Sequence, residues 1–216
     1  MTDEQPQLEL ETPSELVKDL FGVSFSAVEL FADKLAAEGE LRGLVGPREL
    51  PRLWSRHVVN CAALLPYLPR RGTVLDVGSG AGLPGIVIAA ARPDLEVTLV
   101  EAMERRCEWL AEVSDELGLD NVQIINARSE DLGRSIRADV VTARAVASLD
   151  KLIRITSKLI APHGRLLALK GQRAYTEVEQ AAKELKRHHL DAQVYEVVSV
   201  MDGETTYVEE CKRVAN

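Results

Sequence analysis

Several features that mark common protein classes are scarce or absent in this chain. Its 216 residues include only three cysteines, Cys61, Cys107 and Cys211, which lie far apart with no Cys-x-x-Cys pair. This spacing argues against a disulfide framework and against a zinc site, so we expect no bound metal. The start of the chain lacks the basic and then apolar pattern of an export signal, and no run of about 18 apolar residues occurs. These absences predict a cytoplasmic protein that does not enter a membrane.

Basic residues are fewer than acidic ones, 26 against 34, and they are unevenly distributed along the chain. The formal net charge is -8, and residues 1–40 carry two basic against ten acidic groups. Residues 41–75 carry six arginines against one glutamate, and residues 151–190 carry nine basic groups against three acidic ones. Such local excesses indicate anion binding, although solvated helix faces explain them as well. Aromatic residues make up only 4% of the chain, which disfavours the stacking platforms of single-strand nucleic-acid binders.

The order of predicted elements indicates an α/β fold. Residues 1–11 are polar and acidic and are predicted to form a loose tail, and residues 12–70 to form a region of short helices. From residue 71 to the end, apolar strands alternate with helices. The predicted strands are 73–77, 96–101, 122–126, 138–142, 164–170, 193–200 and 205–214, and the predicted helices are 84–91, 103–118, 149–161 and 175–189.

This alternation predicts a seven-stranded, mostly parallel sheet with helices on both faces. The short link that contains Asp202-Gly203 predicts that the last two strands form an antiparallel hairpin. A single methyltransferase-like domain of residues 71–216, preceded by the helical region, is the expected organisation.

A glycine-rich turn, Gly78-Ser79-Gly80-Ala81-Gly82, follows the first predicted strand directly. Such a turn lies at the carboxyl edge of the sheet, where ligands of doubly wound folds bind. Asp76 precedes it and would repel a pyrophosphate, but it would favour the ammonium and sulfonium of S-adenosylmethionine. Glu101 ends the second strand, where a carboxylate can bind both ribose hydroxyls, and Ser129-Glu130-Asp131 follows the third strand, where loops can hold an adenine edge. The pattern therefore predicts an S-adenosylmethionine site.

Purely structural roles are the alternative explanation for the same residues. Asp76 could cap a helix, and Glu101 could be a surface acid. A nicotinamide-dependent oxidoreductase is disfavoured by Asp76, by the hairpin ending and by the lack of a Tyr-x-x-x-Lys pair. A binding module without cofactor is disfavoured because the glycines and both acids are all present.

Four stretches resemble one family in sequence order. Residues 76–89, DVGSGAGLPGIVIA, are similar to the signature of the RsmG family, also called GidB. Arg56-His57 resembles the family's RH segment, residues 142–149 (TARAVASL) resemble its SRAxASL segment, and Leu169-Lys170-Gly171 resembles its LKG segment. The four pieces span about residues 40–175. Thr142 stands where many members have serine, and the acidic first 40 residues match nothing in the pattern.

The resemblance implies a Rossmann-like class I S-adenosylmethionine methyltransferase that modifies guanine N7 in the 530 loop of 16S ribosomal RNA. It implies that Gly78, Leu83, Ser129, Glu130 and Arg144 hold the cofactor; Asp76, Gly80 and Glu101 complete the predicted set. The expected substrate is the RNA within the small subunit or its precursor, and a monomer is expected. A methyltransferase for a small molecule or a protein remains the alternative.

Guanine N7 already has a free lone pair, so the reaction requires positioning rather than a general base. Arg144 is predicted to be catalytic, between cofactor and base, where its guanidinium can stack or bind guanine O6. The alternative is that Arg144 only pairs with Glu130 to lock two loops. Lys170, at the end of the fifth strand, is the second catalytic candidate. His57 either contributes to the substrate site or makes a structural hydrogen bond between the helical region and the core.

The remaining predictions concern RNA contacts. RNA phosphates are expected to bind arginines of the basic segment, residues 41–75, and Arg173 on the opposite side of the site. RNA binding should therefore weaken steeply as the salt concentration rises. The predicted contact residues are Arg42, Arg48, Arg52, Arg56, His57 and Arg173.

Overall fold

The computed structural model describes residues 10–133 and 136–214. The helices are α1 (Glu15–Phe21), α2 (Phe25–Glu38), α3 (Asn60–Ala62), α4 (Gly85–Ala91), α5 (Glu104–Glu116), α6 (Leu149–Thr156), α7 (Ala174–Gln180) and α8 (Ala182–Arg187). Short 3₁₀ turns and one π-helical segment, η3 (Trp54–Val59), connect α2 to α3 and neighbouring elements. The strands are β1 (Gly72–Val77), β2 (Leu95–Glu101), β3 (Val122–Asn126), β4 (Ala138–Arg144), β5 (Ile160–Lys170), β6 (Leu190–Val198) and β7 (Thr205–Arg213).

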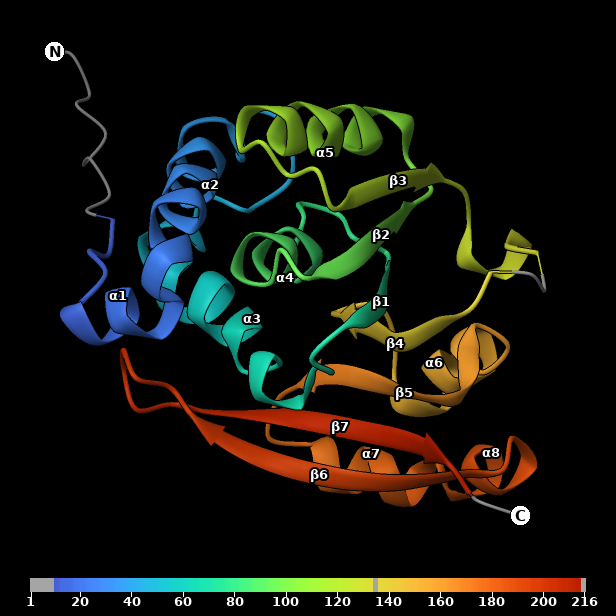
Figure 1. Ribbon diagram of the computed structural model, residues 1–216. Coiled ribbons are helices and arrows are strands. Elements are labelled where there is room, and N and C mark those ends of the chain that lie inside the picture. Colours follow the sequence, from blue (N-terminus) through green and yellow to red (C-terminus); the bar gives the residue numbers. More distant parts are fainter. Residues whose placement is uncertain (1–9, 134–135, 215–216) are drawn as a thin grey trace, which may run out of the picture.

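The seven strands form one sheet in the order β3-β2-β1-β4-β5-β7-β6 (Figure 1). The first five strands run parallel, while β7 pairs antiparallel with both β5 and β6. The predicted seven-stranded sheet with a closing hairpin is therefore confirmed. After β1 the chain builds outward through β2 and β3, then returns to add β4 on the other side of β1. Such a switch in direction opens a crevice at the carboxyl ends of β1 and β4, where ligands bind.

Both faces of the sheet are covered because the strand side chains alternate between two apolar clusters. Val74 of β1 belongs to the cluster with α4 and α5, whereas Leu75 and Val77 belong to the cluster with α6 and α8. The helical region is part of the first cluster, since Phe31 and Leu35 of α2 are buried together with the core of α4. The N-terminal helices thus share one core with the sheet, which brings the segments around η3 next to the glycine turn.

The predicted loose tail of residues 1–11 falls mostly outside the described residues. Glu11 is described, and its carboxylate accepts hydrogen bonds from the Ser55 N–H (2.8 Å) and the Ser55 hydroxyl (2.7 Å). The end of this segment is therefore tied to η3. No helix within residues 10–133 and 136–214 combines the length and the apolar character that crossing a bilayer requires.

Several predicted boundaries differ from the structure; the strand predicted over 193–200, for example, is β6 at Leu190–Val198. The helix predicted over 149–161 ends at Thr156, because residues from Ile160 onward pair with β4. At Gly164 the strand passes so close to β4 that a Cβ atom would lie 2.8 Å from the Ala138 carbonyl oxygen. Pro162 and this glycine are residues that strands disfavour, so the sequence did not indicate that the strand begins before them.

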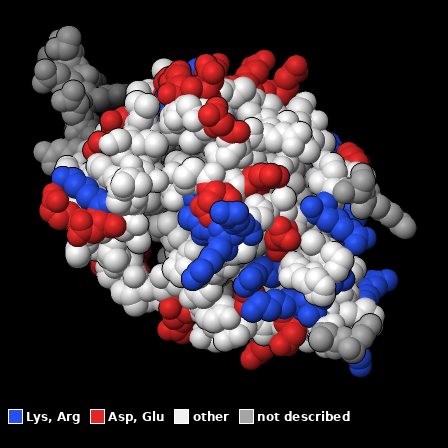
Figure 2. All heavy atoms as spheres, in the orientation of Figure 1, with Lys and Arg blue, Asp and Glu red and all other residues white. Residues whose placement is uncertain are grey.

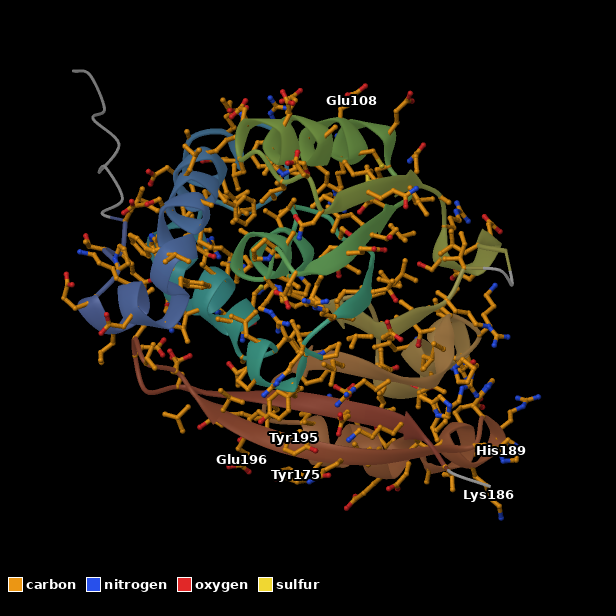
Figure 3. The ribbon with its side chains drawn as sticks, viewed as in Figure 1. Glu108, Tyr175, Lys186, His189, Tyr195 and Glu196 are labelled. Carbon is orange, nitrogen blue, oxygen red and sulfur yellow. The ribbon has the colours of Figure 1, made fainter. Side chains whose placement is uncertain are left out.

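The helix predicted over 175–189 is two helices, α7 and α8, which separate at the buried Ala181. No glycine or proline marks that break in the sequence. Together they cover one side of the hairpin, and the Tyr175 hydroxyl donates to Glu196 of β6 at 3.0 Å (Figure 3). The hairpin turn itself occupies residues 199–204, with Gly203 at φ +73°.

Candidate active site

The glycine turn connects β1 to α4 at the carboxyl edge of the sheet. Gly78, Gly80 and Gly82 have φ of +71°, +55° and +99°, the left-handed region that side chains with a Cβ rarely adopt. The Gly78 and Ser79 N–H groups donate to the Val100 carbonyl at 2.9 and 3.1 Å, so the turn is fastened to β2. A Cβ on Gly78 would lie 3.0 Å from a methyl of Val146. The positive φ angles explain why these three positions are glycine, and at Gly78 the missing Cβ also leaves space beside Val146.

A cavity of about 380 Å³ lies beside this turn and is called here the smaller cavity. Among the predicted cofactor residues, Gly78, Gly80, Leu83, Glu101 and Arg144 line it, as do His57, Ser79, Ala81, Leu44, Val45, Arg106, Ala145 and Val146. The carboxylate of Glu101 accepts the Gly80 N–H at 3.0 Å and the Met103 N–H at 2.9 Å, and Arg106 lies 3.8 Å away. Glu101 is thus held at the cavity wall rather than on the open surface.

Asp76 lies behind the turn and is fully buried. One carboxylate oxygen accepts the N–H of Gly85, the first residue of α4, at 3.1 Å, as the helix-capping alternative required. Within residues 10–133 and 136–214, the other oxygen has no hydrogen-bond partner, and neither has the buried hydroxyl of Thr142, the residue of β4 that pairs in register with Asp76 of β1. Burial raises the pKa of Asp76 to about 7. Two unsatisfied polar atoms beside a glycine cradle fit a cationic ligand or an ordered water that it brings.

Ser129 and Glu130 lie in the short turn η5 (Ser129–Asp131) after β3. Ser129 is buried, Glu130 is exposed, and neither lines the smaller cavity. The main-chain carbonyl of Glu130 accepts a hydrogen bond from Lys158. Their role toward the adenine edge stays a prediction.

Arg144, the last residue of β4, is bound by the helical region. Its guanidinium donates to the His57 ring at Nδ1 (2.7 Å), to the carbonyl of Arg56 (3.1 Å) and to the Asn60 side-chain oxygen (3.4 Å). Glu130 is not among these partners, so the alternative of an Arg144–Glu130 lock does not describe the structure. The hydrogen bond between His57 of the helical region and the core, by contrast, is present, with Arg144 as its donor.

A second cavity of about 1000 Å³, called here the larger cavity, lies on the other side of Arg144. Arg144, Ala145 and Val146 line both cavities and therefore separate them. The larger cavity is lined by side chains from η3, the loop after β4, the end of β5 and the tip of the hairpin. Its charged residues are Arg56, Arg144, Lys170, Glu177, Asp202 and Glu204.

Lys170 lies in the wall of the larger cavity and is almost fully engaged. Its ammonium donates to the Ala147 carbonyl at 2.8 Å and pairs with Glu177 at 2.6 Å. The same Glu177 oxygen accepts the Leu149 N–H at 3.0 Å. Lys170 and Glu177 thus hold the end of the loop that leads from β4 into α6.

The predicted RNA-binding arginines divide into two groups. Arg56 is half exposed, lines the larger cavity and lies 3.4 Å from Glu49, while Arg52 pairs with Asp202 and Glu204 of the hairpin at 3.4 and 2.8 Å. Arg48 and Arg173 are exposed but outside the cavities.

Arg42, by contrast, belongs to a helix-packing network. It pairs with Glu38 and Glu112 and lies over the Trp109 ring, 5.2 Å from its centroid. Figure 2 shows acidic side chains along the α5 edge and basic ones over the half that holds α6 and α8.

Sequence reasoning missed Glu49, Asn60, Glu177, Asp202 and Glu204. Asn60 accepts from Arg144 and donates to the Thr206 hydroxyl at 2.8 Å, joining α3, β4 and β7. These residues carry no motif of their own. Tertiary contacts bring four of them to the larger cavity and place Glu49 against His57.

Comparison with known proteins assigns the family. The family model described as rRNA small subunit methyltransferase G matches residues 24–206. The ribosomal RNA small subunit methyltransferase G of Beutenbergia cavernae is 50% identical, with 92% of this chain and 94% of the relative covered. That of Thermobifida fusca is 47% identical over 88% of this chain and 80% of the relative.

Solved structures agree on the fold at low sequence identity. A SAM-dependent O-methyltransferase from Thermotoga maritima has a TM-score of 0.57 at 17% identity, covering 73% of this chain and 65% of that one. M. jannaschii TYW2 in complex with AdoMet has a TM-score of 0.55 at 18% identity, covering 74% and 78%. The predicted Rossmann-like methyltransferase fold and the predicted family are both confirmed: the chain belongs to the rRNA small subunit methyltransferase G family.

Proposed function

We propose that this protein transfers a methyl group from S-adenosylmethionine to N7 of a guanine in the 530 loop of 16S ribosomal RNA. We further propose that it acts as a monomer in the cytoplasm on the small subunit or its precursor. The observation that supports this most directly is the pair of cavities that meet at Arg144. One is a glycine cradle with acids, and the other is wide, polar and bordered by arginines.

The smaller cavity suits the cofactor. The main chain of Gly78 and Gly80 and the side chains of Leu83 and Glu101 would hold it, while the unpartnered oxygen of Asp76 lies behind the turn. When bound there, S-adenosylmethionine supplies an electrophilic methyl group on a sulfonium. A carboxylate near a sulfonium and an ammonium lowers the energy of the bound cation.

The larger cavity suits a base that has left its stack. A guanine ring must enter edge first for N7 to face the smaller cavity, and enzymes reach such atoms by extruding the nucleotide. Arg144 stands at the boundary, where its planar guanidinium can donate to guanine O6 or stack on the ring without protonating N7. Because N7 carries its lone pair already, the residues need only hold and orient the base. Lys170 contributes by fixing the loop that separates the cavities.

The helical region 12–70 completes the substrate site rather than forming a separate module. Arg56 and Ser55 from η3 line the larger cavity opposite the hairpin residues Asp202 and Glu204. Arg48, Arg52 and Arg173 lie outside its lining on this proposal, where phosphate groups of the RNA would approach.

The experiment that tests this function offers labelled S-adenosylmethionine and three acceptors: small ribosomal subunits, naked 16S RNA and total cell protein. We expect label in the RNA, at guanine N7 in the 530 loop when the modified nucleotide is mapped. Label in protein but in neither RNA acceptor would overturn the proposal.

Arg144→Ala sharpens the same assay. Loss of a group that orients the reacting base should reduce turnover by about a hundredfold while melting temperature changes little. The matched control is Arg154→Ala, an arginine of α6 that pairs with Asp150 and Glu184 and lines neither cavity. An equal loss of turnover and stability in Arg144→Ala would assign Arg144 a structural role.

A further inference from the structure

A chain of three charged or polar side chains runs from the surface to the boundary of the two cavities. The carboxylate of Glu49 lies 3.2 Å from Nε2 of His57, and Nδ1 of the same ring lies 2.7 Å from a terminal nitrogen of Arg144. The His57 side chain is only 13% exposed, whereas that of Glu49 is 36% exposed. Glu49 also faces Arg56, whose guanidinium is 3.4 Å away.

The contacts of His57 define its protonation state. A guanidinium carries only donors, so Nδ1 must accept from Arg144 and cannot hold a proton. The single ring proton is then on Nε2, which donates it to Glu49. Burial and the nearby cation of Arg144 lower the pKa of His57 to about 4, although Glu49 acts in the opposite direction. A neutral ring with this tautomer is therefore the state that the packing supports.

The consequence falls on Arg144. Its shortest hydrogen bond is the one to His57, and its other contacts, to the Arg56 carbonyl and the Asn60 oxygen, are longer. All of them come from residues 56–60, so this one segment sets the direction of the guanidinium. The next residue, Ala145, has a φ of +56°, a conformation that a residue with a Cβ adopts only under constraint, and it lines both cavities. The direction of Arg144 is thus imposed from outside its own strand.

We propose that Glu49 and His57 are positioning residues: Glu49 holds the His57 ring in the tautomer that accepts from Arg144, and His57 aims the Arg144 guanidinium at the boundary where the base is held. This inference rests on the proposed role of Arg144 toward the guanine. It gives the histidine a task in orienting a neighbouring group rather than in contacting RNA or moving a proton.

Two substitutions of the same residue separate the two hydrogen bonds. Asparagine places its side-chain oxygen as many bonds from Cα as Nδ1, so His57→Asn keeps an acceptor for Arg144 and loses the contact with Glu49. Glutamine places its amide nitrogen as many bonds out as Nε2, so His57→Gln keeps the contact with Glu49 and loses the acceptor for Arg144. Both variants are polar and smaller than histidine, so they disturb the packing to a similar extent.

The two variants should differ in turnover and in little else. In His57→Gln we expect kcat on small subunits to fall about tenfold to a hundredfold, as for a misaimed orienting group, with the KM for RNA and the cofactor Kd within about twofold of wild type. His57→Asn should keep most of the wild-type kcat. Glu49→Ala should lower kcat severalfold. If adding Glu49→Ala to His57→Gln lowers kcat only slightly below that of His57→Gln alone, the two residues act as one unit.

Several outcomes would overturn the proposal. These are equal kcat in the two histidine variants, a loss that parallels the loss of melting temperature, and a larger effect on the KM for RNA than on kcat. A readout independent of activity is the ¹⁵N spectrum of the His57 ring in the wild-type protein. We expect a neutral ring protonated on Nε2 at pH 7. Protonation on Nδ1 would refute the proposed positioning of Arg144 by His57.

The spectrum also separates this inference from the proposed function. If the protein failed to methylate RNA but the tautomer were as stated, the function would be wrong and the Glu49–His57–Arg144 geometry would stand. If methylation mapped as proposed while the tautomer or the variant pattern did not, only the positioning role would be lost.

Discussion

The two cavities on either side of Arg144 are built in different ways. The smaller one is formed around one continuous turn, residues 78–83, together with the ends of β2 and β4 and a few residues of the helical region and α5. The larger one is formed by side chains of several segments that are far apart in the sequence, such as Arg56 of η3 and Asp202 at the tip of the hairpin. Replacing one glycine changes the conformation of a whole turn, whereas replacing one side chain of the larger cavity removes a single contact or charge.

This difference predicts how substitutions should act. Changes in the glycine turn should affect cofactor binding in a nearly all-or-none way, because the main chain of the turn cannot shift to make room for an added side chain. Changes around the larger cavity should produce graded effects that depend on salt and pH, since its walls are ion pairs. The predictions for Gly78, Arg56 and the hairpin acids test that contrast, and the one for Glu209 concerns stability, since this residue lines neither cavity.

The largest effect is expected from Gly78→Ala. The new Cβ would lie 3.0 Å from Val146 at φ +71°, so the turn or the loop after β4 must move, and affinity for S-adenosylmethionine should fall by about tenfold or more. Calorimetry with the purified protein measures this. Gly118→Ala is the matched control, because it has a similar φ of +62° with nothing within 4 Å and lies outside both cavities. Similar cofactor affinity in both variants would contradict the idea of a main-chain cradle.

A stability effect is expected from Glu209, which lies fully buried on β7 near Lys170 and Glu177. Neither of its carboxylate oxygens has a partner among the described residues, and burial raises its pKa to about 7. The folded state therefore binds a proton more tightly than the unfolded state, and ionising Glu209 costs stability as pH rises from about 5 to above 7. Glu209→Gln should stabilise the protein by about 1–2 kcal/mol at pH 8 and have almost no effect at pH 5.

Denaturant titrations at the two pH values check this prediction. The control is Glu179→Gln, an exposed residue of α7 whose replacement should change stability little at either pH. A gain in the Glu209 variant that is the same at pH 5 and pH 8 would show that its carboxyl is not the titrating group.

A smaller effect is expected from Arg56→Ala at the larger cavity. Loss of one phosphate contact should weaken binding of small-subunit RNA severalfold and reduce the salt slope of log K by about one. Arg187→Ala, at a residue of α8 whose side chain is 68% exposed, is the control and should leave RNA binding and its salt slope unchanged. If the Arg56 variant binds RNA with the wild-type salt slope, this arginine is not a phosphate contact.

The smallest effect is expected from the hairpin acids. Glu204 and Asp202 hold Arg52 in ion pairs, and an RNA phosphate must compete with them for that guanidinium. The double variant Asp202→Asn with Glu204→Gln should therefore bind RNA about two- to threefold more tightly at low salt, with the gain disappearing at high salt. Weaker binding in that variant would mean that these acids contact the RNA favourably.

Much of the smaller cavity could be predicted from the sequence. Asp76, the glycines, Leu83 and Glu101 lie in two strands and the turn that joins them to helices, so local pattern and strand order place them together. The helix starting at Pro84 and the closing hairpin were predictable for the same reason, because their signals are short-range. Where such signals were missing, as at Ala181 and before Ile160, the predicted boundaries were wrong.

The sequence by itself determined the alternation of strands and helices, the glycine cradle and the acids around it, because each depends on neighbours within a few residues. Only the tertiary structure decided that Arg144 meets His57, 87 residues away, instead of Glu130, and that Lys170 and Glu177 hold the dividing loop. The physical reason is that side-chain hydrogen bonds depend on distances between elements, and these follow from how the whole core packs rather than from any local pattern.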